Sequence, residues 1–168
     1  MIFLDLDGVV ADFDRHATEQ DKRHSDGSIN RDLMDFQWWS TIPVFEGAHD
    51  FFEALKALAP VKFLTGPMLN PASHGGKAEW LSKKFLTKQE KWALRDLIIC
   101  PSKDKHLLAQ ENRILIDDRI NNIKDWEAAG GIAIHHTGDF NETLSKVDRV
   151  LKKNNQPIKS VPKSNLAP

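Results

Sequence analysis

Five short apolar runs, separated by longer stretches with helical spacing, limit most strongly what this chain can fold into. The runs are rich in strand-favouring side chains and too short for helices, and they cover residues 2–4, 61–64, 97–100, 114–116 and 132–135. The stretches 48–58, 72–85, 105–110, 121–129 and 141–153 have the pattern of helices. Strands that alternate with helices form a parallel sheet. The predicted fold class is therefore α/β, a doubly wound, Rossmann-like parallel sheet.

Polar residues follow four of these runs at the point where each predicted strand ends. They are the acids Asp5 and Asp7, then Thr65 and Gly66, then the lysines Lys103 and Lys105, and finally Asp117 and Asp118. Each group alone is typical of a turn, a solvated face or a helix cap. Four such units in succession are rarely produced by independent turns. Ligands of open α/β sheets bind at the carboxyl ends of the strands, so we expect these groups to share one site.

The first of these units favours phosphoryl transfer. A carboxylate at a strand end, such as Asp5, can attack phosphorus, and a second acid, Asp7, helps to hold a hard cation such as Mg2+. Gly8 lets the backbone turn sharply beside a ligand. An ordinary acidic turn is the alternative for a bare D-x-D-G, and the other three units count against it.

The segment DLDGVVADFD, residues 5–14, resembles the first motif of the haloacid dehalogenase superfamily of phosphatases. Its form is that of the 5'(3')-deoxyribonucleotidases, also called pyrimidine 5'-nucleotidases type C. Thr65-Gly66-Pro67 is similar to the second motif, in which a hydroxyl and neighbouring N–H groups hold a phosphate oxygen. Asp117-Asp118 is similar to the fourth motif, whose acids complete a metal site.

The resemblance also implies a lysine that neutralises the nucleophile and the phosphate. The nucleotidase pattern has an Asp-Lys pair after the third strand, which matches Asp104-Lys105. Lys105 is therefore favoured, Lys103 stays as the alternative, and Lys77 is a weaker third candidate.

A mechanism follows from the resemblance. Asp5 attacks phosphorus and forms an aspartyl-phosphate, while Asp7 protonates the leaving oxygen and later activates water. The expected cofactor is Mg2+, with Asp118 favoured as a direct ligand and Asp117 orienting Lys105 or a metal-bound water. The resemblance also implies that Asp5 and the backbone carbonyl of Asp7 are metal ligands. It implies that Thr65, the Gly66 N–H and Lys105 bind the phosphate.

The segment from Arg15 to about Ile42 breaks the strand–helix rhythm and contains an aromatic cluster. By resemblance it is a small inserted cap in which Phe36, Trp38 and Trp39, with Phe13, sandwich a nucleotide base. The alternative is that the two tryptophans only pack the cap onto the core. The expected organisation is a core of residues 1–14 and 43–153, a cap of residues 15–42 and a flexible tail of residues 154–168.

Composition restricts the expected partners and location. The chain has 168 residues, 40% of them hydrophobic, and a formal net charge of −1, so neither a stable nucleic-acid complex nor membrane binding is expected. It has no apolar run of membrane-spanning length, and its N-terminus lacks the pattern of a signal segment, which favours the cytoplasm. The single cysteine, Cys100, is predicted to be a buried structural thiol, and no zinc site is expected.

The predicted function is a Mg2+-dependent phosphomonoesterase that dephosphorylates nucleoside or deoxynucleoside monophosphates. One alternative keeps the chemistry and changes the substrate to a sugar phosphate, another small phosphomonoester or a nucleic-acid end. The other is a non-catalytic protein that binds Mg2+ or nucleotides, since a fold does not dictate a function. The cap is short for a mammalian-type nucleotidase, so base, sugar and phosphate position stay open. The oligomeric state also stays open, and the sequence is compatible with a dimer.

Overall fold

A single parallel sheet organises the computed structural model, which describes residues 1–154. Its strands are β1 (Ile2–Leu4), β2 (Val61–Thr65), β3 (Leu97–Ile99), β4 (Ile114–Asp117) and β5 (Ile132–His135). They lie in the order β3-β2-β1-β4-β5, and every neighbouring pair is parallel. The prediction of an α/β fold with a doubly wound parallel sheet is confirmed. Each predicted strand agrees with an observed one to within one residue.

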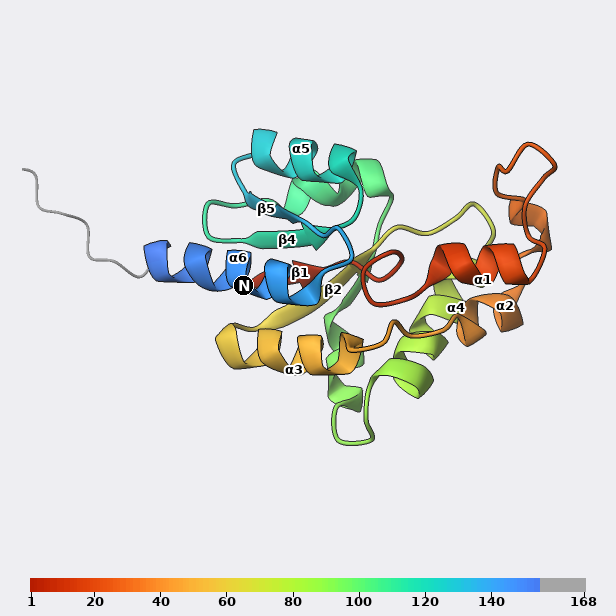
Figure 1. Cartoon of the computed structure of the whole chain (residues 1–168), viewed down its shortest axis with the longest axis horizontal. Coiled ribbons are helices and arrows are strands. Elements are labelled where there is room, and N and C mark those ends of the chain that lie inside the picture. The colour runs from red at the N-terminus through yellow and green to blue at the C-terminus, as the bar shows by residue number, and fades with distance from the viewer. Residues whose placement is uncertain (155–168) are drawn as a thin grey trace, which may run out of the picture.

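Alternate side chains of the strands enter two separate cores, because successive residues of a strand point to opposite faces. Ile2 and Leu4 of β1 belong to the larger core, and Phe3 between them belongs to the smaller one. The larger core includes residues of α3 (Ala48–Leu58) and α6 (Phe140–Asn154), which pack against each other. The smaller core contains Trp126 of α5 (Ile120–Ala128). Helices therefore cover both faces of the sheet (Figure 1).

The segment between β1 and α3 lies beyond the carboxyl ends of the strands (Figure 1). It contains α1 (Phe13–Glu19), the short 3-10 helix η1 (Arg31–Leu33) and α2 (Phe36–Thr41), and α2 packs against α4 (Ala72–Trp80). A Cβ atom on Gly76 of α4 would lie 2.2 Å from the Cβ of Trp39, so only glycine permits this close approach. We refer to residues 13–42 as the insertion.

Several helices differ from the sequence prediction. The predicted helix 72–85 consists of α4 followed by the π-helical turn η2 (Leu81–Phe85). The predicted helix 105–110 is instead the 3-10 helix η4 (Ser102–Leu108), and η3 (Lys91–Asp96) and α1 were not predicted. These segments are short, so their apolar periodicity is weak and tertiary contacts decide their form.

The predicted flexible tail, residues 154–168, lies outside the described residues except for Asn154, where α6 ends. Within residues 1–154, none of the helices is both long enough and apolar enough to cross a membrane.

Candidate active site

The loop after β1 places two acids at the carboxyl edge of the sheet. Asp5 is buried, and its backbone N–H donates to the Ile116 carbonyl at 3.0 Å, which continues the pairing of β1 with β4. The chain then turns at Gly8, which has a φ of 76°. A Cβ atom there would lie 2.3 Å from Oδ2 of Asp118. Gly8 is therefore required both by its backbone conformation and by the acid packed against it.

Lys105 lies between two carboxylates in the interior of this edge. Its Nζ is 2.9 Å from Oδ1 of Asp5 and 2.7 Å from Oδ2 of Asp117, and its side chain is buried. Burial alone would lower the pKa of Lys105, but the two carboxylates outweigh it and raise that pKa above its ordinary value. Lys103 is exposed to solvent. Of these two lysines, the structure brings only Lys105 to the acids.

A second buried lysine reaches the same edge from α4. The ammonium of Lys77 donates to a carboxylate oxygen of Asp7, to Oγ1 of Thr65 at 2.9 Å and to the Gly66 carbonyl at 2.5 Å. Lys77 was the weakest of the three predicted candidates. One sequence signal points to it: Lys77 lies four residues after Ser73 and three before Trp80, a spacing that puts the three on one helix face, and this face is buried in the structure. A charged residue on a buried helix face is unusual unless it is paired.

Asp7 is held by Lys77 but stays reachable. Its side chain is 26% exposed, whereas that of Lys77 is almost fully buried. Burial raises the pKa of the Asp7 carboxyl above its ordinary value, and the nearby charge of Lys77 opposes that effect. An acid with a raised pKa at a partly open position is suited to carry a proton to a ligand.

The adjacent acids Asp117 and Asp118 have different environments. Asp117 is fully buried and accepts hydrogen bonds from the Arg119 N–H, the Asn122 amide and Lys105, at 2.7–2.9 Å. Oδ1 of Asp118 is buried and has no hydrogen-bond partner among the described residues. Burial, together with the charges of Asp5 and Asp117, raises the pKa of Asp118 to about 7. Asp117 is thus fully engaged by the protein, and Asp118 is not.

The three acids fit a metal ion that prefers oxygen ligands. Asp5, Asp117 and Asp118 each offer a carboxylate oxygen, and these atoms all lie within 4.8 Å of one another. A hard dication such as Mg2+ takes carboxylate oxygens of this kind. The unpartnered oxygen of Asp118 is the atom that such an ion would satisfy, since buried polar atoms rarely lack a partner.

The aromatic residues of the insertion are not equally accessible. Trp38 and Trp39 are only 5% and 1% exposed, and their ring centroids lie 5.4 and 5.6 Å from that of Phe13. Packing of the insertion on the core accounts for the burial of both tryptophans. Phe36 is 46% exposed and lies beside Gly75 of α4, apart from that cluster. Phe13 is partly buried, so Phe13 and Phe36 keep more of their ring surface accessible than the two tryptophans.

Comparisons with known proteins find little of comparable sequence. No family model and no curated protein matches the chain. Among solved structures, the chain is similar to the HAD domain of the effector protein Lem4 from Legionella pneumophila, with 13% sequence identity and a TM-score of 0.48. The match covers 92% of this chain and 96% of that one.

Proposed function

We propose that this chain is a Mg2+-dependent phosphomonoesterase of the haloacid dehalogenase superfamily that acts on nucleoside or deoxynucleoside monophosphates. One observation carries the proposal: the ends of three strands and two helices, α4 and η4, bring three acids, a hydroxyl and two buried lysines to one edge of the sheet. They are Asp5, Asp7, Asp118, Thr65, Lys77 and Lys105. Each has a role in the transfer of a phosphoryl group.

Asp5 is the nucleophile. Its carboxylate oxygen attacks phosphorus, and the bond from phosphorus to the substrate oxygen breaks as the aspartyl-phosphate bond forms. The ammonium of Lys105, 2.9 Å from Oδ1, pairs with this carboxylate and fixes its position. Asp117 in turn holds Lys105, so it acts as a positioning residue.

Asp7 is the general acid and base. Its raised pKa favours the protonated form that gives a proton to the leaving oxygen of the nucleoside. The resulting carboxylate then takes a proton from the water that hydrolyses the aspartyl-phosphate, which returns the enzyme to its starting state. Lys77 holds the Asp7 side chain in place during both steps.

Thr65, the Gly66 N–H and Lys77 are positioned to stabilise the phosphoryl oxygens. Lys77 donates to Thr65 at 2.9 Å and is buried, so its charge acts in a region of low dielectric. This assignment gives Lys77 the phosphate-binding role that the sequence analysis expected of Lys105. Lys105 instead serves the nucleophile and Asp117.

The expected Mg2+ ligands are Asp5, Asp118 and the backbone carbonyl of Asp7. When bound, the ion neutralises negative charge that collects on the transferring group. Asp118 is the acid of the pair with a buried oxygen that no group within residues 1–154 satisfies, which supports its assignment as a direct ligand.

The substrate class rests on the aromatic residues near the site. Phe13 belongs to the A-D-F triplet that resembles the nucleotidases, and Phe36 keeps nearly half of its surface exposed. A flat apolar ring of this kind can stack on a base. A sugar phosphate or other small phosphomonoester has no flat base to stack on these rings.

The test is phosphate release from deoxy- and ribonucleoside 5'- and 3'-monophosphates, sugar phosphates and p-nitrophenyl phosphate, in the presence of Mg2+. We expect nucleotides to be hydrolysed fastest, and we expect Asp5→Asn to lose on the order of 10⁴-fold in rate. Lys103→Ala, at the exposed lysine, is the matched control and keeps wild-type activity. Turnover of sugar phosphates alone would contradict the substrate class. Absence of any turnover with saturating Mg2+ would favour a non-catalytic binding protein.

A further inference from the structure

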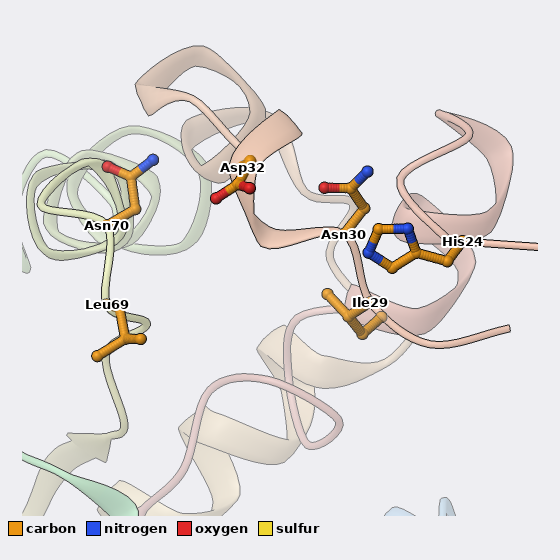
Figure 2. A pocket seen from close by; sticks show the side chains of 6 residues that line it. All are labelled: His24, Ile29, Asn30, Asp32, Leu69 and Asn70. Carbon is orange, nitrogen blue, oxygen red and sulfur yellow. The ribbon is translucent and has the colours of Figure 1, made fainter. Parts of the chain in front are cut away.

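A cavity of about 530 Å3 lies between the insertion and the loop that follows β2. It is lined by His24, Ile29, Asn30, Asp32, Leu69 and Asn70 (Figure 2). The mechanism proposed above uses none of these residues. Four of the six side chains are polar, and one of them is a carboxylate.

Hydrogen bonds hold both walls of this cavity. In the insertion, Arg23 and Ile29 form an antiparallel bridge, and the Asn30 N–H donates to the Lys22 carbonyl at 2.9 Å. On the other side, the Asn70 amide accepts from the Ala72 N–H at 2.9 Å and donates to the Met34 carbonyl at 3.4 Å. The second contact joins the loop to the insertion, so the two walls keep a common position.

The cavity is close to the proposed phosphate site along the chain. Asn70 lies four residues after Gly66, so their Cα atoms are at most about 15 Å apart. Asp32 lies four residues before Phe36, the exposed aromatic ring proposed to stack on a base. A phosphomonoester with its phosphate at Thr65 could therefore extend its organic end toward the cavity.

The lining favours a group that donates hydrogen bonds. Figure 2 shows the carboxylate of Asp32 pointing from the insertion toward the side of the cavity formed by Leu69 and Asn70. Asp32 is exposed to solvent and Asn30 is half-buried, so both can be reached by a ligand. An ionised carboxylate only accepts hydrogen bonds, whereas an amide both donates and accepts. A carbonyl oxygen placed against Asp32 would be repelled.

We propose that this cavity recognises the edge of the nucleobase and selects bases that carry an exocyclic amino group over bases with an oxo group at the same position. Asp32 accepts from the amino group, and Asn30 pairs with the neighbouring ring nitrogen. Carboxylate and amide side chains pair with the amino groups of cytosine and adenine in this way. The proposal deepens the proposed function and rests on it, because the base reaches the cavity only when the phosphate lies at Thr65.

The test compares deoxycytidine and deoxyuridine monophosphates, in which an amino group replaces an oxo group on the base. We expect kcat/KM to be at least about tenfold higher for the cytidine nucleotide, since a bound amino group would pair with the Asp32 carboxylate, whereas a bound oxo group would face that carboxylate without a hydrogen bond. Asp32→Asn should bring the two substrates to within about twofold of each other. Asp26→Asn removes the same charge from the insertion at an exposed residue that accepts hydrogen bonds from Ser28, and should keep the preference.

Two further measurements separate this proposal from the proposed function. Hydrolysis of p-nitrophenyl phosphate, which has no base, tests the phosphatase chemistry alone. Equilibrium binding of the nucleosides deoxycytidine and deoxyuridine tests the cavity without turnover. Selective binding of deoxycytidine that Asp32→Asn abolishes supports the cavity even if no phosphate is released. Equal binding and equal turnover of the two bases, or a preference that survives Asp32→Asn, overturns the proposal.

Discussion

The carboxyl edge of the sheet and the insertion differ in how far their ion pairs are exposed to solvent. At the edge, Lys105 is buried between Asp5 and Asp117. In the insertion, Arg23 pairs with Asp14, whose side chain is 84% exposed. A buried pair fixes geometry at a cost in desolvation, whereas an exposed pair is screened by water and contributes little. The buried pairs therefore fix the geometry of the edge, whereas the exposed pair adds little to the stability of the insertion, whose Trp38 and Trp39 are buried.

Helix α4 connects these two regions. Its Lys77 reaches Asp7 at the edge and lies 5.0 Å from the ring centroid of Trp39 in the insertion. Its Gly76 allows the close approach of Trp39. A change in the packing of the insertion should therefore alter the position of Asp7, because Lys77 contacts both Trp39 and Asp7.

The largest effect on stability should come from the buried aromatic residues of the insertion. Trp39→Ala should lower the free energy of unfolding by about 3–5 kcal/mol, because it leaves a cavity in the core. Phe36→Ala, at a residue that is nearly half exposed, should change it by less than about 1 kcal/mol and raise KM for nucleotides. Urea unfolding and steady-state kinetics measure the two effects. Equal losses of stability would show that the insertion does not depend on buried packing.

The next effect concerns the two lysines of the edge. Lys77→Met should lower kcat/KM by about 10²–10³-fold, since it removes a buried cation from the proposed phosphate site and leaves Asp7 without its ion-pair partner. Lys103→Met, on the exposed lysine, should leave kcat/KM within about twofold. Kinetics on p-nitrophenyl phosphate give the comparison without any contact to a base. A wild-type rate for Lys77→Met would remove Lys77 from the mechanism.

A moderate effect should separate the adjacent acids Asp117 and Asp118. Asp117→Asn should lower the free energy of unfolding by about 1–3 kcal/mol, because Asp117 is a buried acceptor for Lys105 and Asn122. Asp118→Asn should keep stability without metal but lose the rise in melting temperature that Mg2+ gives the wild type. Thermal unfolding with and without Mg2+ distinguishes the two. A Mg2+ response that persists in Asp118→Asn would contradict its assignment as a ligand.

The smallest effect should come from two buried histidines, one in each region. Burial lowers the pKa of His16 in the insertion and of His136 beside α6 below the ordinary value of 6.5. Below about pH 6.5 these histidines therefore bind more protons in the unfolded chain than in the folded chain. The free energy of unfolding falls as the pH is lowered. His16→Gln and His136→Gln should each flatten this dependence in urea unfolding between pH 5 and 7. If neither variant does, other groups cause the loss of stability in acid.

Sequence patterns located the strands well because a strand of a buried sheet is a short, continuous apolar run. Helices α3 and α5 were also predicted to within one residue, since their amphipathic patterns are clear. Helix α1 and the 3-10 and π-helical turns were missed or misplaced. They are short, and the contacts that stabilise them come from residues far away in the sequence.

For the candidate site, the sequence analysis named the acids and Thr65 because each directly follows a strand. It ranked Lys77 last, because Lys77 is delivered by a helix whose orientation depends on the contact of Gly76 with Trp39. The cavity lined by Asp32 and Asn70 had no sequence signal, since its two walls come from segments almost 40 residues apart. The catalytic roles of all these residues remain predictions.

Local patterns along single strands were enough to predict the fold class and the acids at the edge of the sheet, because neither depends on contacts between distant segments. The tertiary structure decided which lysine meets Asp5 and which meets Asp7, which acid of the Asp117–Asp118 pair is left without a partner, and which aromatic rings are covered. These properties depend on burial and on contacts between distant segments, and packing alone establishes them.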